Sequence, residues 1–347
     1  MTSRERVLTA FEHKKPDRVP AWCGASPDFW EKARQELGLD DEELRLRFGD
    51  DFRWVFHKYV GSLSRTAPTC LTETVFGIKR DGVGYGQPLS HPLAEASLKE
   101  IHDYPWPDPT EVDASSMRAD AEKYRGEYAI FGGQWSPFFH DVIDMFGMEN
   151  LYFKMYDEPE LVDAAIQHIV DFYAESTTRI FDATGDVIDI LFMGNDFGSQ
   201  TGPMLGVELF DRFILPHLRR LSDIGHSYGL KTMLHCCGGI APLIPSLIES
   251  GLDGLHAIQT TCQGMDLAKL KADFGDKILF NGGIDSHHVL IEGTPELVRE
   301  ETQHVLEIMM PGGGYVAGAT HDYILGETPV ENVVAMFDAI REYGSYS

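Results

Sequence analysis

The sequence lacks long apolar runs and has little positive charge. No stretch approaches the roughly 20 apolar residues that a membrane span needs, and the charged first eleven residues lack the apolar centre of a signal peptide. Only 29 Lys and Arg stand against 55 Asp and Glu, which gives a net charge of −26. Because phosphates and anionic lipids attract basic surfaces, this balance argues against a nucleic acid or a membrane as partner. We therefore predict a cytoplasmic protein.

Cysteines are few, and nucleotide-binding motifs are missing. The five cysteines in 347 residues are an odd number at irregular spacing, which indicates reduced thiols instead of a disulfide framework. No predicted strand is followed by G-x-G-x-x-G or by a P-loop, and the glycines at 312–314 precede a strand, as in a turn. The sequence thus gives no support to a nucleotide-dependent fold.

Short apolar runs alternate regularly with longer helical stretches. Such runs are typical of parallel strands buried on both faces. The strands are predicted at 19–23, 128–133, 189–193, 231–235, 254–258, 278–281 and 314–317. The helices are predicted at 3–12, 27–37, 41–48, 111–124, 137–146, 159–184, 206–228, 241–250, 265–274, 295–309 and 329–343. Seven or eight such strands predict a (β/α)8 TIM barrel forming a single domain over residues 1–347, with a doubly wound open sheet as the alternative.

Two parts of the chain do not follow this alternation. The N-terminal segment is mainly helical, with an acidic start to the helix at 41–48. Residues 51–109 contain short β-type pieces separated by glycines and prolines, which is typical of hairpins. We expect 51–109 to be a hairpin-bearing insertion that covers the barrel mouth.

The end of one predicted strand carries His235, Cys236 and Cys237. Residues two apart on a strand point to the same side, so His235 and Cys237 face one way and Cys236 faces the other. The carboxyl ends of barrel strands are where active sites form. An imidazole and a thiolate together favour zinc over magnesium or calcium. We therefore predict that His235 and Cys237 bind zinc, against the simpler interpretation of buried core residues.

Other polar residues follow the predicted strands and share this mouth. They are Cys23, Gln134, Asn195, Asp196, Gln259, Asn281 to Asp285, His321 and Asp322. A catalytic zinc ion needs three protein ligands and one open position. Asp322 is our candidate for the third ligand, with His321 as a less favoured choice and Asp196 as a further one.

Several stretches resemble the uroporphyrinogen decarboxylase superfamily over essentially the whole chain. They are Ser3-Arg-Glu-Arg-Val7, Pro16-Asp-Arg-Val-Pro20, Gly282-Gly-Ile-Asp285, Gly293-Thr-Pro-Glu296 and Thr328-Pro-Val-Glu-Asn-Val333. The resemblance implies a barrel fold and one of two chemistries. True decarboxylases hold a substrate with many carboxylates through an arginine-rich N-terminal motif, whereas this chain has Trp22-Cys-Gly-Ala-Ser-Pro27 there, without arginine. The other branch comprises zinc-dependent methyltransferases that work with a corrinoid protein.

The resemblance to the methyltransferase branch is close at one position and departs at two. The branch has a His-x-Cys motif, matched by His235 and Cys237, and a distal cysteine, which aligns with Asp322. A glutamate often found after the next strand aligns with Gln259. Members that activate a thiol use the distal cysteine, so its replacement favours similarity to members acting on methoxylated or methylated donors.

We therefore predict a zinc-dependent methyltransferase that moves a methyl group from a small methylated donor to a corrinoid. No Asp-x-His-x-x-Gly corrinoid-binding sequence is present, so the resemblance implies a corrinoid carried by a separate partner protein. Asp196, Asn195 and Gln259 are expected to orient the substrate or the zinc ligands, and Trp22, Trp135, Phe138 and Phe139 to wall an apolar pocket. The alternatives are a decarboxylase of a smaller substrate, a methylcorrinoid:acceptor methyltransferase, and a corrinoid-partner binding protein without turnover.

Overall fold

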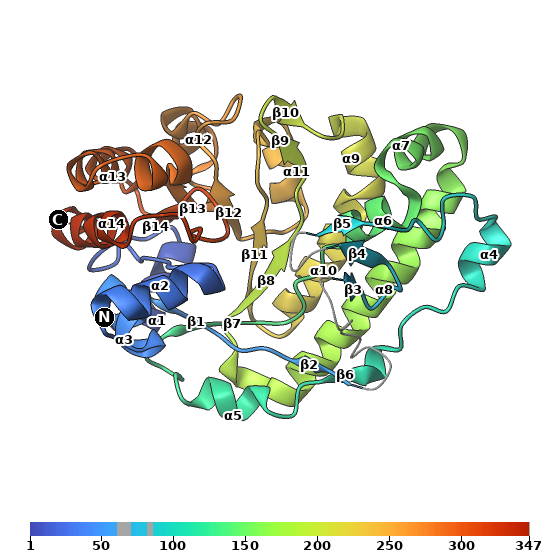
Figure 1. Ribbon diagram of the computed structural model, residues 1–347, viewed down its shortest axis with the longest axis horizontal. Helices are drawn as coiled ribbons and strands as arrows, with labels where there is room; N and C mark the ends of the chain where they lie inside the picture. The colour runs from blue at the N-terminus through green and yellow to red at the C-terminus, as the bar shows by residue number, and fades with distance from the viewer. Residues whose placement is uncertain (61–70, 82–85, 347) are drawn as a thin grey trace.

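A computed structural model describes residues 1–60, 71–81 and 86–346. Seven parallel strands form one curved sheet in the order β1-β7-β8-β11-β12-β13-β14 (Figure 1). Their bounds are β1 Phe52–Trp54, β7 Ala129–Gly132, β8 Ile190–Gly194, β11 Lys231–His235, β12 Gly254–Ile258, β13 Leu279–Ile284 and β14 Tyr315–Ala319. All strand pairs in this sheet are parallel, as the apolar runs predict.

The two edges of the sheet are joined by the segment around Ala21. Trp22 N–H donates to the Ala317 carbonyl of β14 at 3.0 Å, and on the other side Asp51 N–H donates to the Ala21 carbonyl at 2.9 Å, just before β1. This segment therefore takes the place of an eighth strand, and the predicted TIM-barrel fold is confirmed. It forms isolated bridges instead of the regular strand expected at 19–23, because Pro20 has no N–H to donate.

Helices surround the sheet and fill the connections between strands. The helices before and between β7 and β11 are α5 Met117–Glu122, α6 Phe138–Phe146, α7 Met148–Asp157, α8 Pro159–Thr184, α9 Val207–Phe213 and α10 Leu215–Ser227. The later ones are α11 Ile244–Glu249, α12 Leu267–Phe274, α13 Pro295–Met309 and α14 Val330–Tyr343, with a π-helical turn, η5 Ser286–Ile291, after β13. The helix expected at 206–228 is broken at Ile214, and Pro216 lies in the first turn of α10, where its missing N–H costs nothing.

The N-terminal helices α1 Ser3–Phe11, α2 Pro27–Leu37 and α3 Asp41–Phe48 lie beside α14 and the C-terminus (Figure 1). Val7 and Phe11 of α1 pack into the inner core of the barrel, with Phe131, Phe192 and Met233 from the strands. Phe11 approaches Gly254 at the start of β12, and Arg4 N–H donates to the Glu127 carbonyl just before β7. Helix α1 thus closes the amino-terminal end of the barrel, and the functional mouth is the opposite end.

The segment predicted as an insertion begins with a barrel strand, because β1 covers Phe52–Trp54. Three residues flanked by charged Asp51 and interrupted by Arg53 give little apolar pattern, which explains why the sequence did not reveal this strand. Beyond it are a two-stranded pair, β2 Lys58–Tyr59 with β6 Val112–Asp113, and an antiparallel sheet of β3 Leu71–Glu73, β4 Lys79–Asp81 and β5 Gln87–Pro88. A short helix, α4 Leu98–His102, follows. Cys70, counted above as a free thiol, lies outside the described residues.

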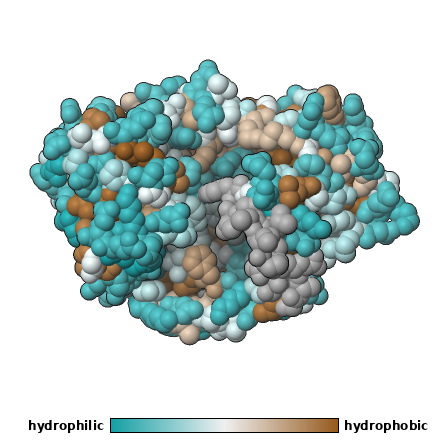
Figure 2. Space-filling view, viewed as in Figure 1, coloured by the Kyte–Doolittle hydropathy of each residue, from teal (hydrophilic) through white to brown (hydrophobic). Residues whose placement is uncertain are grey.

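Figure 2 shows a mainly hydrophilic face with a hollow near its centre. This surface agrees with the excess of acidic residues in the sequence. In the described ranges, no helix combines the length and the apolar character that crossing a bilayer requires.

A buried carboxylate connects the N-terminal segment to the barrel, and its removal is our first prediction. Asp51 is fully buried, pairs with Arg6 at 2.8 Å and Arg18 at 2.9 Å, and accepts the Ala21 N–H at 2.9 Å. Asp51→Ala removes the carboxylate that the buried Arg6 shares with Asp17, and it removes the acidic partner of the partly buried Arg18. We therefore expect the free energy of unfolding to fall by about 3–5 kcal/mol. Chemical denaturation measures this change.

Asp103→Ala is the control, because Asp103 forms an exposed ion pair with Lys99 on the surface. Exposed pairs contribute about 1 kcal/mol or less. An equal effect of the two variants would contradict the role assigned to Asp51.

Candidate metal centre

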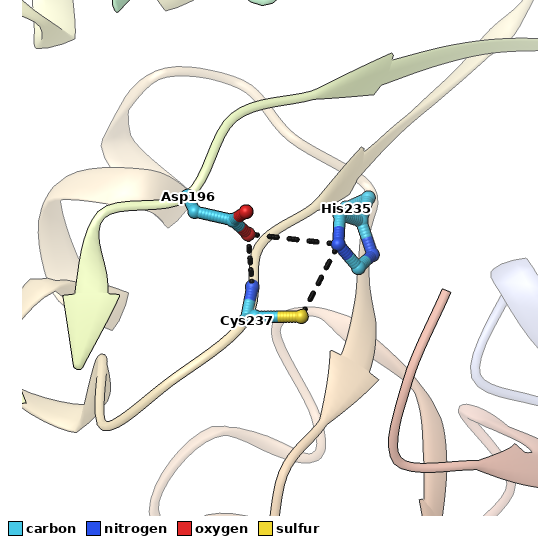
Figure 3. A group of neighbouring side chains, drawn as sticks. All are labelled: Asp196, His235 and Cys237. Atoms are coloured by element: carbon cyan, nitrogen blue, oxygen red, sulfur yellow. Dashed lines mark hydrogen bonds and ion pairs between the residues drawn. The ribbon is translucent and has the colours of Figure 1, made fainter. Parts of the chain in front are cut away.

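Two neighbouring strands bring three potential metal ligands together at the barrel mouth. Asp196 follows β8, His235 ends β11, and Cys237 lies two residues further on. His235 is in register with Gly194 of β8, so the chain beyond each strand starts at the same level. Figure 3 shows the three side chains pointing toward one another.

The donor atoms of these side chains lie within 4.8 Å of one another. His235 Nε2 is 3.3 Å from Cys237 Sγ and 3.5 Å from Asp196 Oδ1. The same Asp196 oxygen accepts the Cys237 N–H at 2.7 Å. Cys236 turns away, is buried, and accepts the Phe197 N–H at 3.3 Å through its sulfur, as strand alternation predicts. One nitrogen, one sulfur and one oxygen are therefore available to a single cation.

Two glycines allow the loops after β8 and β11 to cross. A Cβ on Gly198 would lie 2.7 Å from the Cys237 carbonyl oxygen, and one on Gly238 would lie 2.4 Å from the Gly198 carbonyl carbon. Gly238 also has a φ of 92°, which a side chain disfavours. This close approach brings the Asp196 carboxylate to the Cys237 amide.

Burial sets the ionisation of the ligands. Removal from water lowers the pKa of His235, so its imidazole is neutral and a nitrogen lone pair is free. Burial and the nearby Asp196 carboxylate raise the pKa of the Cys237 thiol far above its usual range. Without a cation the thiol therefore keeps its proton, whereas a bound divalent cation favours the thiolate.

His256 holds the ring of His235 from behind. Its Nδ1 lies 3.0 Å from His235 Nδ1, which leaves His235 Nε2 directed at Cys237. Trp22 stacks on His256 with ring centroids 4.2 Å apart. Burial lowers the pKa of His256 well below its usual value, so both imidazoles are neutral and one donates to the other. A ligand orientation fixed in this way is typical of metal sites.

Replacing His256 is our second prediction. His256→Phe keeps an aromatic ring against Trp22 but removes the nitrogen that orients His235. Loss of such a supporting hydrogen bond lowers metal affinity by about 10–100-fold. Competition with a chelating dye measures the zinc dissociation constant, and thermal unfolding checks that the fold is retained. An unchanged dissociation constant in a folded variant would show that His256 does not position the ligand.

The structure places the other predicted site residues around this cluster. Asn195 is fully buried, where its Oδ1 accepts Phe139 N–H and its Nδ2 donates to the Ser136 carbonyl, both at 3.0 Å. Gln259 Oε1 accepts Gly238 N–H at 3.0 Å. Both side chains thus hold backbone at the mouth.

Asp322 and His321 lie after β14 and pair with each other, with Nδ1 and Oδ1 2.6 Å apart. The Asp322 charge acts on the pKa values of both His235 and Cys237, so Asp322 belongs to the same mouth. The compact group of ligand atoms, however, contains Asp196 and not Asp322.

Two histidines at the mouth were not identified from the sequence. His256 lies inside an apolar strand, where the only signal is its polarity within a buried run. His140 lies on α6, where its Nε2 accepts the Asp196 N–H at 3.2 Å. Its place beside Asp196 depends on how α6 packs, which the local sequence does not show.

Comparison with known proteins gives the family. The model of the uroporphyrinogen decarboxylase (URO-D) family matches residues 76–343, which is most of the chain. The chain belongs to this family. Within it, MtbA of Methanosarcina mazei, a methylcobamide:CoM methyltransferase, is 21% identical over 99% of this chain and 98% of its own length. The match to MtbA of Methanosarcina acetivorans, 23% identical, spans 64% of this chain and 61% of that protein.

Other URO-D family proteins are similar at comparable identity. The uroporphyrinogen decarboxylase of Alkalilimnicola ehrlichii is 25% identical over 75% of this chain and 70% of its own length. A solved methyltransferase structure from Methanosarcina mazei superposes with a TM-score of 0.71 at 18% identity and covers 99% of both chains, which confirms the fold. All these relatives agree with the predicted family, and the methyltransferases among them support its methyltransferase branch.

Proposed function

We propose that this protein binds zinc at the barrel mouth and transfers a methyl group from a small methylated donor to the cobalt of a separate corrinoid protein. The observation that carries this proposal is the compact set of His235 Nε2, Cys237 Sγ and an Asp196 oxygen. The names of the methylcobamide-dependent relatives support a corrinoid as reaction partner.

The donor set fits zinc better than other common ions. Thiolate and imidazole are soft and borderline ligands, which magnesium and calcium disfavour. Three protein ligands leave a fourth tetrahedral position for a substrate atom, as in catalytic zinc sites. When bound, zinc supplies a Lewis acid that stabilises the negative charge developing on the heteroatom that loses its methyl group.

The protein's own residues keep this arrangement in place. Asp196 ties the loop after β8 to the Cys237 amide, and His256 fixes the ring of His235. Gln259 holds the Gly238 amide, and Asn195 joins the end of β8 to the start of α6. These positioning contacts keep the donor atoms close before a metal arrives, which reduces the reorganisation on binding.

A row of aromatic rings leads from the surface to His235 and supports a methoxylated aromatic donor. Phe56, which is 66% exposed, stacks with Trp54 at 5.3 Å, and Trp54 lies 6.5 Å from Trp135. Trp135 in turn stacks on His235 with centroids 5.7 Å apart. The Trp135 ring fits here only because residue 194 is a glycine: a Cβ at that position would lie 1.9 Å from the ring. A flat aromatic ether could stack along this row with its oxygen near the ligands.

The corrinoid partner must reach the same mouth. The described part of residues 51–109 extends there, since Tyr59 donates its hydroxyl hydrogen to Gln134 Oε1 at 3.0 Å, beyond the end of β7. We propose that this segment shapes the contact with the corrinoid protein. The large negative charge of the chain favours a basic patch on that partner.

The direct test supplies zinc-loaded protein with a corrinoid protein reduced to Co(I). Methoxylated benzoates, methylamines and methyl thioethers are offered in turn, and methylation is followed by the visible spectrum of the corrinoid. We expect methylation with the aromatic ethers. Carbon dioxide release without corrinoid would instead support the decarboxylase. If the protein instead moves a methyl group from methylcorrinoid to a thiol, and no donor methylates the corrinoid, the transfer runs in the opposite direction to the one proposed. Corrinoid-protein binding without turnover on any donor would indicate a binding protein.

A further inference from the structure

A second group of metal-binding side chains lies away from His235, on the surface. It consists of His287 and His288 on η5 and of Glu292 at the end of this turn. All three are exposed, with 57–63% of each side chain accessible. Asp285, directly after β13, fixes the start of the turn because its Oδ1 accepts the N–H groups of His287 and His288 at 2.8 and 3.3 Å.

The π-helical geometry brings these side chains together. Leu290 N–H donates to the Asp285 carbonyl and Glu292 N–H donates to the His287 carbonyl, both at 3.0 Å and both spanning five residues. In a regular α-helix, residues five apart point in directions about 140° apart. The wider π turn returns to nearly the same side after five residues, so His287 and Glu292 face one another. Short π-helical segments of this kind occur frequently at functional sites.

The distances suit a metal ion. His288 Nδ1 lies 3.0 Å from Glu292 Oε2, His287 Nε2 lies 3.6 Å from Glu292 Oε1, and the ligand atoms of the group are all within 4.8 Å of one another. A tetrahedral ion bound at about 2.0–2.1 Å separates its ligand atoms by about 3.4 Å. The separations of 3.0 and 3.6 Å lie on either side of this value, so small side-chain rotations complete the site.

We propose that His287, His288 and Glu292 form a second, surface metal site for a divalent transition metal ion such as zinc, cobalt or nickel. Two imidazoles and a carboxylate select these ions over magnesium and calcium. Three protein ligands leave one or more positions to water or to a group from another molecule. The site has no thiolate and is exposed, so it binds its ion more weakly than the mouth cluster does. It follows β13 at the carboxyl end of the barrel, on the face where the mouth opens.

Calorimetric titration of the metal-free full chain with zinc tests the proposal. We expect two binding events, a tight one and a weaker one. The double variant His287→Ala/His288→Ala and the single variant Glu292→Gln should lose the weaker event or raise its dissociation constant by at least about 10-fold. The matched control is His304→Ala. It removes an exposed histidine of α13 that belongs to neither group of potential metal ligands among the described residues.

The titration can test the surface site separately from the cluster at the barrel mouth. Cys237→Ala should abolish the tight event and leave the weaker one, which separates failure of the surface site from failure of the proposed zinc enzyme. Spectra of the cobalt-loaded protein give a second readout, because a thiolate ligand contributes a charge-transfer band that the surface site lacks. A single event lost with Cys237, or a weaker event that survives the His287→Ala/His288→Ala change, would overturn the proposal.

Discussion

Cys237→Ala is expected to reduce bound zinc from about one ion per chain to almost none and to abolish methyl transfer. The sulfur of Cys237 lies 3.3 Å from His235 Nε2, so it is the softest of three converging ligands. Removing a supporting residue around a metal already costs about 10–100-fold in affinity. Loss of a ligand itself should exceed that range, because the two remaining ligands leave a half-empty coordination sphere. Metal analysis after gel filtration and the corrinoid methylation assay measure the two effects.

Cys236→Ala provides the matched control one residue away. Cys236 is also buried, but its sulfur accepts the Phe197 N–H and takes no part in the cluster. This variant should keep its zinc and most of its activity, with at most a modest loss of stability from the small cavity. Full zinc content in Cys237→Ala would refute the proposed centre. Equal zinc loss in both variants would point to damage of the loop instead of loss of a ligand.

The barrel and the pair of ligands His235 and Cys237 could be predicted because both depend on patterns among neighbouring residues. Each central strand is a short apolar run, and six of the seven sheet strands match predicted runs to within three residues at each end, among them β8, β11 and β12. The position of His235 and Cys237 on one side follows from the two-residue period of a strand, which requires no knowledge of the fold. Such features are encoded within a few neighbouring residues.

The remaining features depend on contacts between distant segments. β1 is three residues long and has a buried Arg53 in its centre, whose guanidinium stacks on Tyr128 at 3.7 Å from the ring centroid. No local pattern marks such a strand, because its buried charge pairs with Glu42 of α3 at 2.6 Å and stacks on a ring 75 residues away. The approach of Asp196 to Cys237 likewise requires the crossing of Gly198 and Gly238, two glycines from different loops.

The identity of the third ligand is where the alignment and the geometry differ, and a pair of conservative variants decides between them. The resemblance to the methyltransferase branch points to Asp322, whereas the compact group of donor atoms contains Asp196. Asp196→Asn keeps an oxygen that can accept the Cys237 N–H, now at 2.7 Å, but removes the charge and the strong metal ligand. Asp322→Asn makes the same change on the other side of the mouth.

We expect Asp196→Asn to raise the zinc dissociation constant by about 100-fold or more, and Asp322→Asn to raise it by less than about 10-fold. The reason is distance: Asp196 Oδ1 is 3.5 Å from His235 Nε2, close to the separation of about 3.4 Å between ligands of one tetrahedral ion. Asp322 instead directs an oxygen to His321 and to the Tyr323 amide. The reverse order of the two effects would assign the third ligand to Asp322, and the carboxylate of Asp196 would then serve to hold the Cys237 loop.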